Sequence, residues 1–130
     1  MRSNSSKPFI KSGEIAIRVH MSREIGFSIN VLRLIGCPFY LDFWWGDKEK
    51  LLLVSAAKEP SEASIRLPNS TYTRSGAPFV RNKKLRQVIQ GLTGIANNSI
   101  VIFRGEYVPE VDMVVFQTNG TTRVEVFEDE

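Results

Sequence analysis

The sequence predicts a small α+β domain, mostly β, with one short and one longer helix. Three observations lead to this class. Several segments alternate apolar and polar residues with a period of two, which is typical of half-buried strands. Two segments carry apolar residues at helical spacing between a capping residue and a glycine. The two halves of the chain also follow the same order of expected elements, which indicates an internal repeat.

The composition fits one domain that needs no metal or disulfide support. The chain has 130 residues, a net charge of +3 and a hydrophobic share of 42%, which is enough for a buried core. We expect residues 1–13 to form a flexible N-terminal arm and residues 14–130 a single domain. The single cysteine, Cys37, excludes an internal disulfide. No apolar run is as long as a signal peptide or a membrane span, so a cytoplasmic protein without a membrane partner is expected.

The first half begins with an expected strand and a short helix. Residues 14–22 alternate with a period of two and place Arg18 on the outer face. Ser28 or Asn30 can cap a helix of two turns at most, and Gly36 can end it in the left-handed conformation.

A β-hairpin is expected next, from residues 39–45 and 51–54 around a polar turn. Both faces of its first strand are apolar, and Tyr40 and Trp44 lie opposite the residues expected in the core. Such a strand lies either between two layers or at an interface. Tyr40 and Trp44 are therefore candidate interface residues, with core burial, a homodimer contact and a stacking platform for single-stranded nucleic acid as the open alternatives.

The second half repeats this order. Residues 64–67 predict a short strand, which a turn-rich stretch follows. Asn82 caps the best helical pattern in the chain, and Gly94 stands where its C-terminal cap belongs. Residues 99–103 and 113–116 predict two further strands.

The end of the chain is expected to form a C-terminal hairpin. Residues 104–109 are expected to be a connection. Asn119-Gly120 is typical of a type I′ turn, so residues 121–127 should pair back on the strand before them as an edge strand.

The two halves also share short stretches of sequence. Residues 14–19 align with residues 62–67, and Phe27 to Asn30 aligns with Phe79 to Asn82. The expected repeats, 14–57 and 62–117, each have the order β-α-β-β. A unit of about 45 residues cannot bury both faces of a three-stranded sheet, so two copies would share one core. Chance recurrence of a strand–helix–hairpin order is the alternative.

Charge is unevenly distributed along the chain. Residues 61–104 hold seven basic residues and one acidic residue, whereas residues 105–130 hold one basic and seven acidic residues. Such asymmetry can mark a site for a polyanion. Solvated surfaces also use Lys and Arg, so each basic residue alone has an ordinary explanation.

Residues 14–56 contain the expected strand, Gly26 followed by an apolar-Ser-Ile pattern, a short helix that ends in Leu34-Ile35-Gly36, and a hairpin with an acidic and basic turn. This combination resembles the AbrB/SpoVT swapped-hairpin family of bacterial transition-state regulators and MazE-type antitoxins, and residues 62–116 resemble it more weakly. The resemblance implies a β-barrel of two interleaved β-α-β-β units, and binding of duplex DNA.

The resemblance also implies which residues contact DNA. They are the basic residues on and after the first strand of each unit: Arg18, His20 and Arg23, then Arg66, Arg74 and Arg81. Lys83, Lys84 and Arg86, at the start of the longer helix, are expected to meet phosphates. In such a barrel Arg18 and Arg66 would form one basic surface around a pseudo-twofold axis, which suits a pseudo-palindromic duplex.

No catalytic arrangement is found in the sequence. His20 has no Cys or carboxylate partner at metal-ligand spacing, so neither a metal nor a cofactor is expected. The leading hypothesis is a non-enzymatic DNA-binding transcriptional regulator of AbrB-like type. One alternative is an antitoxin-like or mobile-element accessory module that binds a protein through its aromatic face. The other is a ferredoxin-like RNA-binding domain, which the short first helix disfavours.

Overall fold

Strands dominate the chain, as the sequence predicts. The computed structural model describes residues 13–119 and 123–126, and within them it contains nine strands and two helices. The strands are β1 (Ala16–His20), β2 (Ile25–Phe27), β3 (Tyr40–Gly46), β4 (Leu51–Ala56), β5 (Ile65–Arg66), β6 (Phe79–Val80), β7 (Ser99–Val108), β8 (Met113–Gln117) and β9 (Arg123–Val126). The helices are α1 (Ile29–Leu34) and α2 (Lys83–Thr93). The expected pair of helices, one short and one longer, is confirmed.

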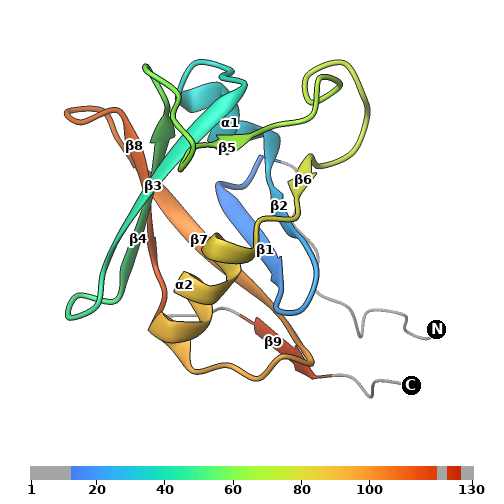
Figure 1. Cartoon of the computed structure of the whole chain (residues 1–130), viewed down its shortest axis with the longest axis vertical. Helices are drawn as coiled ribbons and strands as arrows, with labels where there is room; N and C mark the ends of the chain where they lie inside the picture. Colours follow the sequence, from blue (N-terminus) through green and yellow to red (C-terminus); the bar gives the residue numbers. More distant parts are fainter. Residues whose placement is uncertain (1–12, 120–122, 127–130) are drawn as a thin grey trace.

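Eight strands form a nearly closed antiparallel barrel. Their order around the barrel is β5-β3-β4-β8-β7-β1-β2-β6, and β9 pairs with β7 outside this path. Figure 1 shows β3, β4 and β8 on one side and β1, β2 and β6 on the other, with β7 running diagonally between them. The two end strands, β5 and β6, border an open gap in the barrel wall, which we call the seam. These pairings do not form a ferredoxin-like sheet.

The same order of elements occurs twice, as β1-β2-α1-β3-β4 and as β5-β6-α2-β7-β8. The pairings correspond as well, because β1 pairs with β7 and β5 with β3, while β3·β4 and β7·β8 are both hairpins. Corresponding strands pair with each other in β2·β6 and β4·β8. The β1·β2 ladder has no counterpart among the described strands, because the seam separates β5 from β6. The short strands β2 and β6 were not expected from the sequence.

The two hairpin turns have the same backbone shape. Four residues join β3 to β4 and four join β7 to β8, and the last residue of each turn is left-handed, Lys50 with φ 57° and Asp112 with φ 55°. Left-handed backbone is uncommon for residues other than glycine. The shared conformation therefore adds a detailed likeness between the two halves.

Strand β7 changes partners in its middle, at Gly105. Its first part pairs with β1 and β9, and from Gly105 onward it pairs with β8. A Cβ atom on Gly105 would lie 2.6 Å from the ring of Phe116, which is fully buried. The expected connection over residues 104–109 is therefore wrong, because Glu106 to Val108 continue the ladder with β8.

The expected C-terminal hairpin is also wrong. Strand β9 exists, but it pairs with β7, at Val101↔Val124, and not with β8. The reason is that both edges of β8 are already occupied, one by β4 and the other by β7. The expected turn at Asn119-Gly120 falls partly outside the described residues, as does the N-terminal arm.

Local capping sets the two helices. At α2, the Asn82 side chain accepts a hydrogen bond from the Leu85 backbone N–H at 2.8 Å, and Gly94 ends the helix with φ 70°, both as expected. At α1, Ser28 is the N-cap residue, but its hydroxyl accepts the Ala16 backbone N–H at 3.1 Å and so ties the helix to β1. Asn30 lies inside α1, so it is not the counterpart of Asn82.

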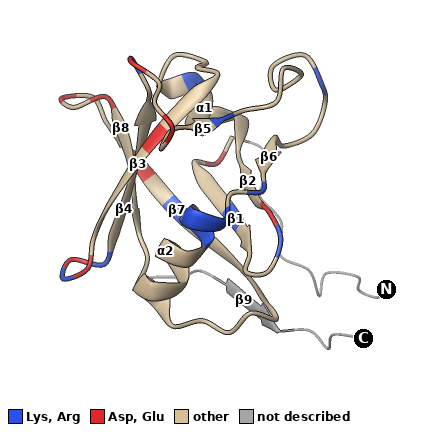
Figure 2. Cartoon of the chain, viewed as in Figure 1, with Lys and Arg blue, Asp and Glu red and all other residues tan. Residues whose placement is uncertain are grey.

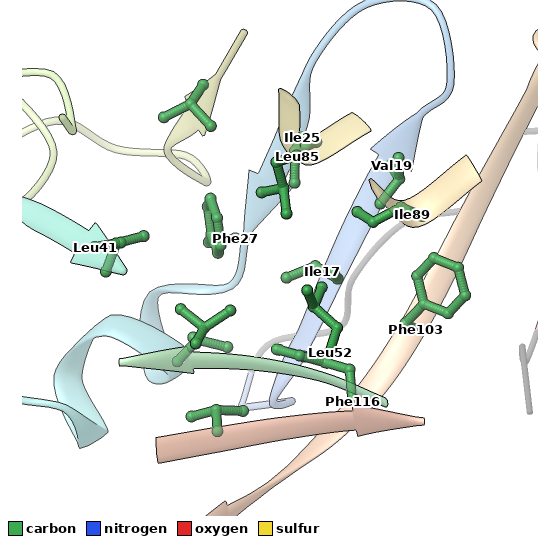
Figure 3. Close-up of a cluster of buried hydrophobic side chains, with 14 of the residues drawn as sticks. Ile17, Val19, Ile25, Phe27, Leu41, Leu52, Leu85, Ile89, Phe103 and Phe116 are labelled. Carbon is green, nitrogen blue, oxygen red and sulfur yellow. The ribbon is translucent and has the colours of Figure 1, made fainter. Parts of the chain in front are cut away.

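One hydrophobic core fills the barrel. Figure 3 shows side chains from both sides of the barrel meeting in it, with Leu85 and Ile89 entering from α2. The core residues labelled there are Ile17, Val19, Ile25, Phe27, Leu41, Leu52, Leu85, Ile89, Phe103 and Phe116. Helix α2 is thus part of the core, and its first turn is held at a fixed place beside the barrel.

We expect Gly105→Ala to destabilise the protein by about 1–3 kcal/mol, because the new methyl group would overpack against the fully buried Phe116 ring. Urea unfolding measures the change. Gly91→Ala, on the exposed side of α2 with nothing within 4 Å of the new Cβ, is the matched control and should stabilise by up to about 1 kcal/mol. Equal stabilities of the two variants would show that the Phe116 contact does not constrain β7.

Candidate nucleic-acid interface

The seam between β5 and β6 is an open groove of about 490 Å³. Its lining is Ile65, Arg66, Leu67, Pro68, Asn69, Phe79, Val80, Arg81 and Asn82. Two arginines line it and no Asp or Glu does. The guanidinium carbon of Arg81 lies 6.0 Å from the centroid of the Phe79 ring, and Arg66 Nη2 donates to Asn69 Oδ1 at 3.2 Å. The groove is therefore positively charged and rich in hydrogen-bond donors.

Two further cations adjoin the seam. Arg74 lines a smaller hollow that shares Pro68 and Phe79 with the groove. Lys83 follows Asn82 directly and is exposed at the first position of α2, whose first turn has no acidic residue. The helix N-terminus adds partial positive charge at the same place. We call Arg66, Arg74, Arg81 and Lys83 the basic groove.

Arg18 lies farther along the same outer surface. It pairs with Gly26 on β2, and Gly26 pairs with Phe79 on β6. Directly paired residues point to the same face of a sheet. Arg18 and Phe79 therefore lie on the same face, on either side of Gly26, which has no side chain. Arg18 is half-buried, and β2, β6 and the seam separate it from Arg66.

His20 and Arg23 lie at the end of β1 and in the turn that follows it. Arg23 is exposed, whereas His20 is 7% exposed, and its Nδ1 lies 3.3 Å from the Ser22 hydroxyl. Burial is the main reason that the pKa of His20 lies below its usual value, with Glu24 opposing that effect and Arg23 adding to it. His20 is therefore a poor donor to an outside phosphate.

The remaining predicted residues of α2 point away from the groove. Arg86 Nη1 donates to the Met21 carbonyl at 3.4 Å, so this side chain holds α2 against the β1–β2 turn. Lys84 places its ammonium 5.7 Å from the centroid of the Trp45 ring. The structure thus brings four of the nine predicted nucleic-acid residues together and distributes the other five over the β1 side and α2.

Asn69 and Phe79 are groove residues that the sequence did not single out. Phe79 is 40% exposed, but β6 is too short for its alternation to show which residues point outward. Asn69 stands in a Pro-Asn-Ser turn whose position beside β6 follows only from the barrel.

Tyr72 fixes the loop between β5 and β6. Its hydroxyl donates to the Pro38 carbonyl, and its ring meets Phe39 edge-on with centroids 5.3 Å apart. The Leu67 N–H also donates to the Phe39 carbonyl, at 2.8 Å. These contacts anchor the loop that carries Arg74 to the segment before β3.

A second surface is aromatic. Tyr40 is 37% and Trp44 46% exposed on the outer face of β3, so core burial does not account for them. Trp44 pairs with Leu53, and Leu53 pairs with Val115. An apolar row therefore crosses β3, β4 and β8 on the outside of the barrel.

Within residues 13–119 and 123–126, no group of three or more His, Cys, Asp or Glu side chains is placed to hold a metal ion. Neither described helix has the length and apolarity that crossing a membrane requires.

Comparison of the chain with protein-family models, curated proteins and solved structures gives no match. A function for the chain therefore rests on its own geometry and chemistry.

We expect Tyr72→Phe to lower stability by about 1 kcal/mol at neutral pH, because the Pro38 carbonyl loses its partner. Burial, followed by the nearby Cys37, raises the pKa of Tyr72 from 10.0 to about 12. The folded state thus retains this proton where the unfolded state loses it, and stability should fall as pH rises from 10 to 12. Urea unfolding across this range should show a shallower fall in Tyr72→Phe. Tyr40→Phe, at an exposed ring, is the control and should follow the wild type.

Proposed function

We propose that the chain is a non-enzymatic, DNA-binding regulator of AbrB-like type that binds duplex DNA through the basic groove. The observation that carries the proposal is that Arg66 and Arg81 line one hollow and Arg74 an adjoining one, and that neither hollow is lined by an acidic residue. Lys83 directly follows Asn82 of the groove lining. Guanidinium groups bind phosphates in bidentate geometry, and several cations on one face release counterions from DNA.

The charge distribution supports an oriented approach of DNA. Figure 2 shows Asp and Glu on β3 and in the β7–β8 turn, whereas Lys and Arg lie between β6 and α2, at the start of α2 and in the loop between β5 and β6. The acidic side of the barrel would repel phosphates. DNA would therefore meet the side that holds the basic groove.

The repeated order of elements supports the finer assignment. We infer that residues 14–57 and 62–117 are two copies of one unit, interleaved as in swapped-hairpin barrels. Corresponding strands that pair antiparallel, such as β2 and β6, are related by a local two-fold axis between them. That axis emerges between Arg18 and the basic groove, where a pseudo-palindromic duplex has the matching symmetry.

We expect the double substitution Arg66→Gln with Arg81→Gln to weaken duplex binding about tenfold or more and to reduce the slope of log K against log salt by about two, because two phosphate contacts are lost. Fluorescence anisotropy with a labelled duplex measures both effects. The double substitution Lys48→Gln with Lys50→Gln, in the β3–β4 turn, removes the same two charges and is the matched control, which should bind like the wild type. Absence of binding even at low salt, or equal affinities of the two variants, would refute the proposal.

A second candidate function follows from Trp44, which is 46% exposed beside Leu53 and Val115. We propose that this row forms a protein contact, in the first instance with a second copy of the chain. Apolar faces of this kind are typical of interfaces.

Light scattering tests this contact. We expect a dimer mass for the wild type and a monomer mass for Trp44→Ser, since the indole is the most exposed large side chain of the row. Phe79→Ser removes another exposed ring, at the seam, and should leave the dimer intact. A monomeric wild type at high concentration would contradict the homodimer.

A further inference from the structure

The seam exposes two strand edges that face each other. The ladder geometry shows which backbone groups point into it. On β5, the Leu67 N–H donates to the Phe39 carbonyl at 2.8 Å, so Leu67 and Ile65 direct their backbone groups to β3. Backbone groups alternate between the two edges of a strand. Arg66, which lies between them, therefore turns its N–H and C=O towards the seam.

The same reasoning applies to β6. The Phe27 N–H donates to the Pro78 carbonyl at 2.9 Å, and Val80 pairs with β2 in the next hydrogen-bonded register. Pro78 and Val80 thus face β2, while Phe79 and Arg81 turn their N–H and C=O groups towards the seam. Both sides of the groove therefore present backbone donors and acceptors with which an added strand could pair.

The side chains around the groove separate by chemistry. Leu67 and Val80 point inward and are buried, at 1% and 7% exposure. Arg66 and Arg81 point outward and are exposed. An extended chain between the two edges would place alternate side chains on these two faces. Its inward residues would meet apolar side chains and its outward residues would meet guanidinium groups.

We propose that the seam binds a short extended segment of a partner protein, in which apolar residues alternate with Asp or Glu, as an added strand between β5 and β6. Main-chain hydrogen bonds supply affinity in such strand addition, and alternate side chains supply specificity. The proposal goes beyond DNA binding. Its regulatory consequence rests on the proposed function, because such a segment would occupy Arg66 and Arg81 and so displace DNA.

The direct test is fluorescence anisotropy of the full chain with a labelled peptide, acetyl-Val-Glu-Val-Glu-Val-Glu-amide. The matched control peptide has N-methyl groups on its three Glu residues, which removes hydrogen-bond donors and preserves charge and side chains. We expect the control to bind about tenfold more weakly or worse, since several backbone bonds are lost. Equal binding of the two peptides, or no binding of either, would overturn strand addition.

Two variants of Arg66 separate the contribution of its charge to peptide binding from that of its backbone N–H. Arg66→Ala and Arg66→Pro both remove the guanidinium, but only Arg66→Pro also removes the N–H that faces the seam. That N–H takes no part in the β3 ladder, and proline is tolerated at such edge positions. We expect weaker peptide binding by Arg66→Pro than by Arg66→Ala, and equal binding would count against the proposal. If circular dichroism shows Arg66→Pro unfolded, Phe79→Pro makes the same test from β6.

A competition experiment connects the segment to DNA. Addition of the unmethylated peptide should release labelled duplex from the protein, and the methylated peptide should release about tenfold less at equal concentration. Peptide binding without any duplex binding would refute the proposed DNA-binding function and would support strand addition at the seam. A single-stranded oligonucleotide that displaces the peptide more strongly than the duplex does would show that the seam recognises phosphate, and would overturn the proposal.

Discussion

The barrel depends on the passage of one strand from one side of the molecule to the other. β7 pairs with β1 before Gly105 and with β8 from Gly105 onward, and the Phe116 ring occupies the space that a side chain at Gly105 would need. This continuous strand joins β5-β3-β4-β8 to β1-β2-β6. The facing edges of the seam follow from it, because β5 and β6 are the last strands of the two groups. The basic groove is thus a consequence of how β7 crosses the core.

The sequence predicted the elements that local chemistry specifies. Alternation located the hairpin of β3 and β4, and caps located both ends of α2, because these patterns lie within a few residues. β2 and β6 escaped prediction because they are too short for a period to be visible. The second half of β7 escaped because Arg104-Gly105-Glu106 interrupts the apolar run, and the partner of β9 because no local pattern shows that both edges of β8 are occupied.

The sequence showed that the candidate site would be basic, but it did not show where on the fold the groove would lie. The excess of basic residues over 61–104 includes Arg66, Arg74, Arg81 and Lys83, but it does not separate them from Lys84, Arg86 and Arg104. The family resemblance pointed to the first three, and the start of the longer helix pointed to Lys83. The groove itself is a missing pairing between strands far apart in the sequence, which no local pattern records. Two of the predicted residues have other contacts in the fold. Arg86 donates to the Met21 carbonyl in the β1–β2 turn, and His20 is buried.

The interleaved pairing also bears on how the chain folds. Each half forms hairpins within itself, but β1 finds its barrel neighbour β7 only in the second half, and β3 finds β5 there. Residues 14–57 alone would therefore leave the apolar faces of β1 and β3 without these partners. Closing such long loops costs entropy before the contacts form. During synthesis, the barrel can close only after the ribosome has released β8, which joins β4 to β7, and its core should then assemble in one cooperative step.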